Sequence, residues 1–595
     1  MKKKNIIIIF VTILFVTYLF RLFWIQIIDE SYKISADNNA IRHIIQYPSR
    51  GLIFDRNNKL LVYNEASYDL MVIPKQLRSF DTLEFCNILN IEKKVLIKKL
   101  KKAKRYSRYK AYLFLKQISK VNYAILQEKL HKFPGFFVEL RTLRKHTTKS
   151  ASHVLGYIGE VTNKNIKKDN YYKSGNYIGQ SGLEKYYEKN LRGKKGIKRM
   201  LVDVHNRIQG SYKNGKYDTI AVSGDNLKTT IDIDLQIYGE DLMKNKIGSI
   251  VVIIPKTGEI LSLISSPSYD PNLLFGRKRA KNYNILSRDS LQPLFNRALM
   301  AKYPPGSIFK IVQALIALQE KVATPYTSIA CNKSLLGCHN HPQATTIEKS
   351  IQYSCNPYYY KIFQRIIQRG KETNIYKDSR IGLLRWHECV TKFGFGKKLK
   401  IDLPSIKAGF IPNVDYYDKI YNGKYTWAFS TIYSLGIGQG EIQVIPLQMA
   451  NLASIIANKG FYYTPHLIKN INKENFKIKN FVGIDGDYFK YIINGMEAVV
   501  NKDGGTARRA RLKDIIICGK TGTAENPHGE DHSVFIAFAP KENPQIAIAV
   551  YVENSGYGGT WAAPIASLMI EKYLKDSITN TFREKRILES NLLAK

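Results

Sequence analysis

The sequence predicts an α+β protein with one membrane-spanning helix, an elongated non-catalytic domain, and a larger domain in which a central antiparallel sheet carries a helical subdomain. Three observations predict it: an apolar run near the N-terminus, buried-strand patterns both early and late in the second half, and a mostly helical stretch between them. At 595 residues, the chain is too long for one ordinary domain. The predicted parts are a short tail (1–4), a transmembrane anchor (5–28), a first domain (29–225), a second domain (226–575) and a C-terminal tail (576–595).

The first element is the anchor, because Ile6–Ile28 is long enough to span a bilayer. Arg21 interrupts the run near its outer end, where its side chain can reach the headgroups. A cleaved signal peptide is the alternative, but the small residues of a cleavage site are missing after Ile28. The lysines at positions 2–4 place the N-terminus in the cytoplasm by the positive-inside rule. We therefore expect a single-pass inner-membrane protein whose domains lie on the extracytoplasmic side.

The formal net charge of +42 suggests either an anionic partner such as nucleic acid or a general bias toward lysine. The lysines are spread along the chain, and no zinc-finger or RNA-binding motif is present, which favours the bias. We expect no nucleic-acid partner. A composition of 44% hydrophobic and 24% charged residues is typical of a globular protein.

The first domain mixes strand and helix signals. Residues 52–62 read as strand, turn and strand, whereas 81–132 read as mainly helical. A short helix is expected after Gly182, ending near Gly193. Nothing in this segment carries catalytic chemistry, so we interpret it as a pedestal.

In the second domain, residues 248–255 and 259–265 predict a hairpin buried on both faces. A further strand and helix are expected before the hairpin, at 228–233 and 234–243. Three more strands are expected much later, followed by a closing helix: 515–523, 533–539, 545–553 and 562–574. Residues of about 305–460 read as helical, so the two halves of one sheet enclose a helical insert, and a cleft can draw residues from both.

Three motifs stand in order along this domain. Ser307 and Lys310 form Ser-x-x-Lys, Ser354 and Asn356 form Ser-x-Asn, and Lys520 begins Lys-Thr-Gly-Thr. This kind of set is typical of penicillin-binding proteins and β-lactamases. Each motif also occurs elsewhere by chance, starting at Ser107, Ser174 and Lys256. Only the set that begins at Ser307 has the expected contexts, namely a helix start, a helical insert and a sheet strand.

The residue types suit acyl transfer. Pro304, Pro305 and Gly306 break the chain before a helical pattern, so Ser307 is expected at a helix N-terminus with Lys310 one turn on. A buried, neutral amine can take the proton of the serine hydroxyl. Ser354 could relay that proton, and Asn356 could hold the substrate peptide and orient Lys310. On the predicted strand, Lys520, Thr521 and Thr523 could bind a substrate carboxylate, and Gly522 would let the substrate backbone approach closely. The N–H groups of Ser307 and Thr523 suit an oxyanion hole.

With these motifs in place, nearly the whole chain resembles the class B penicillin-binding proteins of the rod (elongation) system, the penicillin-binding protein 2 family. The stretches that carry the resemblance besides the motifs are 48–57, 182–187, 191–193, 266–272, 436–440 and 531–540. One departure is Arg144-Lys145-His146-Thr147, where the family tends to carry Arg-Lys-Tyr-Pro.

The resemblance implies a peptidoglycan D,D-transpeptidase that cross-links stem peptides through an acyl-enzyme at Ser307 and is trapped by β-lactams. It further implies a SEDS-type glycosyltransferase and other rod-complex proteins as partners, and no required cofactor. The alternatives are a division-type class B transpeptidase, a penicillin-sensing receptor and a scaffold. A β-lactamase or carboxypeptidase, which would pass the acyl group to water, fits the long pedestal and the uncleaved anchor less well.

A second group of residues could bind a metal. Cys331, Cys338, His339 and His341 lie close together in the sequence, and thiolates with imidazoles are zinc ligands. In an oxidising compartment Cys331 and Cys338 could instead form a disulfide, and free thiols are the third possibility. Cys355 lies inside the Ser-x-Asn motif and would have to point away from the cleft to be a ligand. His532, beside the third motif, is a candidate for supporting the site from behind.

Overall fold

The computed structural model describes residues 3–28, 41–203, 208–276, 278–471 and 474–593. Residues 1–2 of the predicted tail and 29–40 of the predicted pedestal therefore lie outside the described residues. The chain divides into two compact units: Met1–Gly51, Asn64–Leu143 and Lys189–Asp225 form the first, and Leu52–Tyr63, Arg144–Glu188 and Asn226–Lys595 form the second. Each unit is described by itself below.

The N-terminal helix α1 spans Lys3–Phe23 and continues into a π-helical turn, Trp24–Ile28. Within the described residues, Lys4–Ile28 is the one helix long and apolar enough to cross a membrane, with a mean hydropathy of 2.6 over its most apolar window. The hydroxyls of Thr12 and Thr17 donate to the carbonyls of Ile8 and Ile13, so these polar groups are satisfied within the helix. An apolar helix of this kind fits a single-pass inner-membrane protein.

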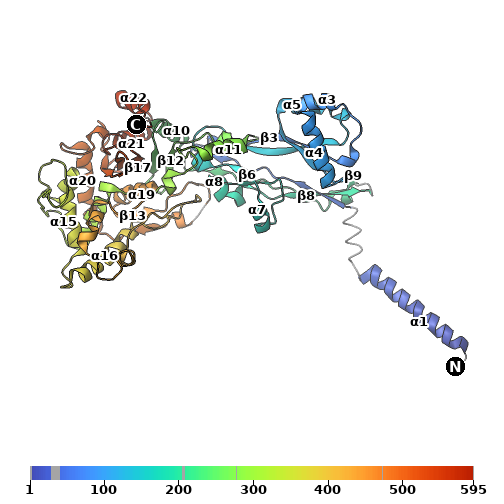
Figure 1. Cartoon of the computed structure of the whole chain (residues 1–595), viewed down its shortest axis with the longest axis horizontal. Helices are drawn as coiled ribbons and strands as arrows, with labels where there is room; N and C mark the ends of the chain where they lie inside the picture. Colours follow the sequence, from blue (N-terminus) through green and yellow to red (C-terminus); the bar gives the residue numbers. More distant parts are fainter. Residues whose placement is uncertain (1–2, 29–40, 204–207, 277, 472–473, 594–595) are drawn as a thin grey trace. The chain divides into compact units, whose positions relative to one another are not determined.

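The first unit gathers α3 (Thr82–Leu89), α4 (Lys93–Tyr106) and α5 (Lys120–Lys129) near strands β3 (Leu60–Val72) and β4 (Tyr112–Ile118), as Figure 1 shows in blue. Their core is rich in phenylalanine, including Phe85, Phe114, Phe133 and Phe136. A second sheet in this unit has the order β1 (Ile41–Gln46), β8 (Gly196–Val202), β9 (Ile208–Ser211). The predicted helical stretch 81–132 is thus interrupted by β4, because its residues pair with β3.

Several smaller elements also have defined bounds. Strand β2 (Ile53–Phe54) pairs with the start of β3, which confirms the predicted strand, turn and strand, and in parallel with β10 (Leu227–Lys228). The others are β5 (Phe136–His146), α6 (Ser152–Leu155), β6 (Ile158–Glu160), α7 (Asn163–Lys168), β7 (Tyr177–Gly179), α8 (Gly182–Tyr186) and α9 (Glu188–Leu191).

The segment that departs from the family pattern is well packed. Arg144 pairs with Glu184 at 2.6 Å between Nε and Oε1, and their side chains are 2% and 0% exposed. His146 is buried, with its Nε2 at 3.1 Å from the carbonyl oxygen of Gly156. An ion pair this deep is held only where both partners are well placed, since burying a lone charge is costly.

The second unit is built on an antiparallel five-stranded sheet with the order β12-β11-β17-β16-β15. The strands are β11 (Gly248–Ile253), β12 (Ile260–Ser266), β15 (Cys518–Ala524), β16 (His532–Ala539) and β17 (Ile546–Val552). Every residue of β11, β12 and β17 is buried, because helices cover both faces of these apolar strands. The early hairpin therefore pairs with the late strands, as the sequence predicts.

Helices surround this sheet, drawn from green to red in Figure 1. Helices α10 and α21 pack against the sheet and against one another, as do α19 and α20. The described helices of this region are α10 (Ile233–Leu242), α11 (Arg279–Arg288), α12 (Arg297–Met300), α13 (Lys310–Gln319), α14 (Ile347–Tyr353), α15 (Asn356–Ile367), α16 (Ile375–Lys392), α17 (Val414–Ile420), α18 (Phe429–Ile432), α19 (Pro446–Ala457), α20 (Phe489–Asn501), α21 (Ala562–Lys575) and α22 (Thr581–Glu589). A small hairpin, β13 (Phe461–Tyr463) and β14 (Lys479–Phe481), follows α19.

Helix α22 lies within the segment that the sequence analysis describes as a C-terminal tail. Its Ile587 is fully buried, and the ammonium group of Lys246 donates to the Ile587 carbonyl at 2.7 Å. This part of the chain therefore packs onto the second unit.

Candidate active site

Ser307 lies in a tight turn between two proline residues and a buried helix. The 3-10 turn Gly306–Phe309 runs directly into α13, as the sequence predicts for a serine at a helix start. Gly306 has a φ of +57°, and a Cβ there would lie 2.5 Å from the carbonyl oxygen of Thr523. Its N–H donates to Gly438 at 2.9 Å. Glycine is therefore required, and the turn is held directly against strand β15.

Lys310 is fully buried one turn after Ser307. Its ammonium nitrogen donates to the carbonyl oxygen of Ser354 at 2.7 Å, to the Ser354 hydroxyl at 3.2 Å and to Oδ1 of Asn356 at 2.5 Å. Burial lowers the pKa of Lys310 to about 8. The geometry thus joins the first two motifs through one amine that loses its proton close to neutral pH.

The Ser-x-Asn motif occupies the junction of α14 and α15. Ser354 ends α14 with a φ of +54°, and Asn356 begins α15. Lys520 of β15 donates to the Ser354 hydroxyl at 2.8 Å, so that hydroxyl lies between two ammonium groups. Burial, and then the charge of Lys310, lower the pKa of Lys520 well below its usual value. All three motifs therefore meet at Ser354.

Strand β15 lies at the edge of the sheet beside a cavity of about 710 Å³. Five of the predicted catalytic and substrate-binding residues line this cavity: Ser307, Ser354, Asn356, Thr521 and Thr523. Lys310 and Lys520 are fully buried. Gly522 lies close to the serine turn, since a Cβ there would be 3.0 Å from the carbonyl oxygen of Pro305.

The cavity also contains residues that sequence reasoning did not single out. Thr506 is one of them, and its hydroxyl lies 2.6 Å from that of Thr521. Gln439 is another, and its side-chain amide donates to the carbonyl oxygen of Thr523 at 3.3 Å. Gln439 belongs to a stretch that resembles the family, whereas Thr506 lies in a loop without a recognisable pattern. Four charged residues also line the cavity: Arg508, Arg509, Glu525 and Asp531.

His532 is the first residue of strand β16, which pairs with β15, and it does not line the cavity. Its Nδ1 accepts from the N–H of Asn554 at 3.0 Å, and its ring centre is 6.2 Å from that of Tyr303. Burial lowers its pKa.

The cysteine- and histidine-rich loop borders the same cavity. One ligand atom each from Cys331, Cys338, His341 and Cys355 lies within 4.8 Å of all the others. The Nε2 of His341 is 3.5 Å from the Cys331 sulfur and 3.4 Å from the Cys338 sulfur. Hydrogen bonding from the Cys355 thiol lowers the pKa of Cys338.

This group differs from the predicted metal set, which stays a prediction. His339 lies outside the group and Cys355 takes its place, because the end of α14 turns the buried Cys355 away from the cavity and toward the loop. Cys331 and Cys338 are both free thiols in this structure. The donor set of three sulfurs and one imidazole fits zinc, which prefers four such ligands.

This loop is bonded directly to the second motif. The N–H of Asn356 points at the Cys338 sulfur at 3.4 Å, and its side-chain amide donates to the carbonyl oxygen of Gly337 at 2.7 Å. The position of Asn356 therefore depends on the loop.

An α+β domain that holds Ser-x-x-Lys, Ser-x-Asn and Lys-Thr-Gly-Thr around one cavity is typical of the acyl transferases that comprise penicillin-binding proteins and β-lactamases. Comparison with known proteins agrees. The family model for the penicillin-binding protein transpeptidase domain matches residues 248–571, and that for the penicillin-binding protein dimerisation domain matches residues 45–229. The chain is 30% identical to the peptidoglycan D,D-transpeptidase MrdA of Acinetobacter baumannii, over 93% of this chain and 84% of that protein.

Two solved structures are similar throughout. Penicillin-binding protein PBP2 of Helicobacter pylori, in its complex with MreC, has a TM-score of 0.73 and 25% identity, covering 90% of this chain and 98% of that one. PBP2 of Pseudomonas aeruginosa, in complex with WCK 5153, has a TM-score of 0.66 and 26% identity, covering 90% and 97%. The chain therefore belongs to the penicillin-binding protein transpeptidase family, in the branch of the MrdA (PBP2) peptidoglycan D,D-transpeptidases.

Proposed function

We propose that this protein cross-links peptidoglycan stem peptides during lateral wall synthesis, with Ser307 as the acyl-forming nucleophile. The single observation that carries the proposal is the convergence of the Lys310 and Lys520 amines on the Ser354 hydroxyl beside the cavity that Ser307 lines. Membership of the MrdA branch favours the rod system over a division-type enzyme.

The first step forms the acyl-enzyme. Neutral Lys310 takes the proton of the Ser307 hydroxyl, and Oγ attacks the carbonyl carbon between the two D-alanines of the donor stem peptide. The negative charge that develops on the carbonyl oxygen is stabilised by the N–H groups of Ser307 and Thr523. The peptide C–N bond then breaks, and Ser354 passes a proton from Lys310 to the amine of the departing D-alanine.

The second step transfers the acyl group. An amine from a neighbouring stem peptide attacks the Ser307 ester, a new amide forms, and the Ser307 oxygen leaves as it regains a proton. The donor is held by the remaining predicted residues. Asn356 binds its peptide group, and the hydroxyls of Thr521 and Thr523 bind its terminal carboxylate. The Lys520 amine lies behind them, held by its hydrogen bonds to the Ser354 hydroxyl and the Thr521 carbonyl oxygen. Gly522 allows the donor backbone to lie close to β15.

Covalent labelling with a fluorescent penicillin tests this assignment. Detergent-extracted full-length protein and its Ser307→Ala variant would be labelled, digested and examined by mass spectrometry. We expect stable labelling of the wild type on the peptide that contains Ser307, and none of the variant. A folded wild type that is not labelled would favour a scaffold, whereas rapid loss of the label would indicate a β-lactamase.

We further propose that Cys331, Cys338, His341 and Cys355 bind a structural zinc ion. When bound, zinc would supply no chemistry to the acyl transfer; the four residues would fix the loop against Asn356. Metal content measured on protein purified without chelators should be about one zinc per chain. Cys355→Ser should lose that zinc, whereas Cys389→Ser, at a buried cysteine outside the group, should keep it.

By family likeness, we propose an orientation and partners. The N-terminus would lie in the cytoplasm and the catalytic domain in the periplasm, because the lysine-rich end precedes the apolar helix. The partners would be a SEDS-type glycosyltransferase and other rod-complex proteins, a proposal supported by the solved complex of H. pylori PBP2 with MreC. Labelling of intact cells with an impermeant thiol reagent, at a cysteine introduced into a surface loop of the second unit, tests the orientation. Co-purification of the partners with the full-length chain tests the assembly.

A further inference from the structure

Tyr303 lies four residues before Ser307 and is fixed by main chain and side chain alike. Its N–H donates to the carbonyl oxygen of Val444 at 2.9 Å, and the N–H of Val444 donates back at 2.8 Å. Its ring stacks on that of Tyr551 in β17, with centres 3.9 Å apart and planes at 16°. The residue is 8% exposed, so both contacts lie within the core.

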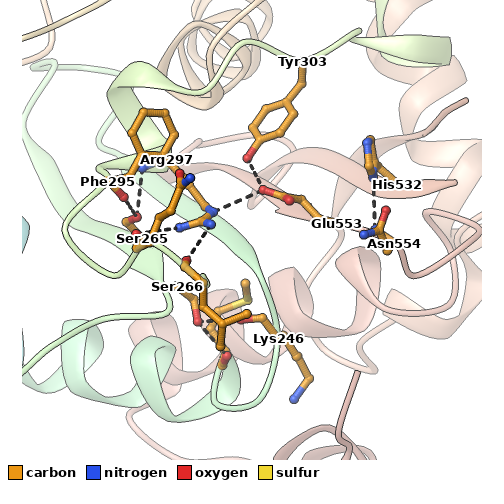
Figure 2. Close-up of polar contacts among 12 residues, drawn as sticks. Lys246, Ser265, Ser266, Phe295, Arg297, Tyr303, His532, Glu553 and Asn554 are labelled. Carbon is orange, nitrogen blue, oxygen red and sulfur yellow. Dashed lines mark hydrogen bonds and ion pairs between the residues drawn. The ribbon is translucent and has the colours of Figure 1, made fainter. Parts of the chain in front are cut away.

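The hydroxyl of Tyr303 reaches a carboxylate at the end of the same strand. It donates to Oε1 of Glu553 at 2.6 Å, and Figure 2 shows the two side chains pointing toward one another. The Glu553 N–H in turn donates to the carbonyl oxygen of Ile247, which fixes its backbone beside β11. The acceptor is charged and mostly shielded from water, at 22% side-chain exposure, so this hydrogen bond is of the stronger kind.

Arg297 binds the same carboxylate oxygen from the other side. Its Nε lies 3.2 Å from Oε1 of Glu553, and its side chain is 8% exposed (Figure 2). The guanidinium also donates to the carbonyl oxygen of Leu291 at 3.0 Å, and the Arg297 N–H donates to the Ser265 hydroxyl at 2.9 Å. Arg297 is thus anchored to β12 and to the loop before α12, and its ion pair with Glu553 holds that carboxylate in place.

The chain between Tyr303 and Ser307 has little freedom to absorb a displacement. Pro304 and Pro305 have φ fixed by their rings. Gly306 is held by its bond to Gly438 and by its close approach to Thr523. A shift of the Tyr303 ring would therefore be transmitted along the turn and would move Ser307 relative to strand β15.

We propose that Arg297, Glu553 and Tyr303 form a positioning unit that sets the place of the Ser307 hydroxyl relative to strand β15. These are positioning residues, since they act through the serine turn and do not touch the substrate. The inference rests on the proposed role of Ser307 as nucleophile. Positioning of a nucleophile affects the bond-forming step more than the initial binding of the ligand, because misplacement of about 1 Å can cost a hundredfold in rate.

The test compares two tyrosines that stack on one another. Tyr303→Phe removes the hydroxyl bound to Glu553 and keeps the ring stacking. Tyr551→Phe is the matched control, because the Tyr551 hydroxyl is buried and has no hydrogen-bond partner within the described residues. For the full-length protein in detergent, the rate constant of acylation by penicillin, k2, and the dissociation constant of the preceding complex, Kd, would be measured with the melting temperature.

We expect k2 of Tyr303→Phe to fall by about tenfold, the effect of losing one charge-assisted hydrogen bond, while Kd changes by less than about twofold. Tyr551→Phe should keep the wild-type k2. Adding Glu553→Gln to Tyr303→Phe should lower k2 by less than the product of the two single effects, because both changes act through one bond.

Two results would overturn the inference. One is a wild-type k2 in Tyr303→Phe. The other is a loss of k2 in Tyr551→Phe as large as that in Tyr303→Phe, which would assign the effect to the ring stack. Failure of the wild type to form a Ser307 acyl-enzyme would instead remove the proposed function, and the inference with it, before any variant is compared.

Discussion

The Lys520 ammonium nitrogen lies 2.8 Å from the Ser354 hydroxyl oxygen, and the same oxygen accepts a second hydrogen bond from Lys310 at 3.2 Å. Both lysines are fully buried. Two cations this close in a shielded site disfavour each other's protonated form. The Ser354 hydroxyl is therefore the point at which a proton can pass between the helical insert and the sheet.

The pH dependence of acylation should follow Lys310. Its folded-state pKa is lowered by burial to about 8, so the amine is mostly protonated below that pH and neutral above it. Only the neutral amine accepts the Ser307 proton, so k2 should rise with pH up to about 8 and then level off, falling roughly tenfold per unit below. A stopped-flow series between pH 6 and 10 checks this. A rate that stays flat, or that falls as pH rises through 8, would contradict the role of Lys310.

Ser354→Ala should slow acylation more than it weakens binding. The change removes the acceptor shared by Lys310 and Lys520 and the path for the proton. We expect k2 to fall by about ten- to a hundredfold, the range for losing a buried hydrogen bond to charged groups. Ser350→Ala is a suitable control, because Ser350 is a buried serine of the same helix whose hydroxyl bonds within the insert, to Ile347 and Tyr359. Equal k2 values for the two variants would argue against the relay.

Gly306→Ala should abolish acylation without unfolding the second unit. A Cβ at this position would lie 2.5 Å from the Thr523 carbonyl oxygen, and the φ of +57° is unfavourable for alanine. The turn would have to move away from β15. Gly486→Ala serves as the comparison, because a Cβ there meets only the Lys459 carbonyl oxygen, at 3.9 Å. Residual labelling of Gly306→Ala above a tenth of the wild-type rate would show that the contact can relax.

Removal of zinc should lower both the melting temperature and the acylation rate. The metal would hold the loop that bonds to Asn356, so its loss frees that side chain. We expect a fall of several degrees on treatment with a chelator, reversed by added zinc. Thermal unfolding and k2 would be followed on the same sample. A drop in melting temperature with an unchanged k2 would show that the metal stabilises the fold but does not affect acylation.

Glu184→Gln should destabilise the second unit while leaving the chemistry intact. The change removes the carboxylate that pairs with Arg144 at 2.6 Å in a site almost closed to water. Breaking a buried ion pair from one side costs about 3–5 kcal/mol. Denaturant unfolding measures the loss, and k2 at low temperature should match the wild type. A stability change below about 1 kcal/mol would contradict this prediction, because it is the value expected of a solvent-exposed ion pair.

The sheet and the helical insert could be predicted because their residues follow clear periods. Strands such as Gly248–Ile253 are rich in Val and Ile, and the three motifs stand in the expected contexts, namely a helix start, the helical insert and a sheet strand. Strand β4 was missed because lysines and short breaks surround it, and its pairing with β3 is a tertiary contact that local sequence does not encode.

The metal set could be predicted only in part, for a similar reason. His339 and His341 both follow Cys338 within three residues, and only the folded loop shows which imidazole lies closer to the sulfurs. The role of Cys355 depends on the left-handed backbone of Ser354, which turns the next residue toward the loop. Similarly, no pattern in the sequence links Arg297 and Tyr303 to Glu553, since Glu553 lies 250 residues after Tyr303 in the chain.

The pairing of β11 with β17 also has a consequence for how the protein is made. Gly248 pairs with Val552, so strand β11 waits for residues synthesised near the end of the chain. Non-local pairing of this kind folds slowly. A nascent chain that extends only as far as the Ser-x-x-Lys motif holds the serine but not strand β15, against which the serine turn packs. Nascent chains stalled before residue 546 should therefore stay unreactive toward penicillin, and sensitivity to the drug should arise only after release from the ribosome.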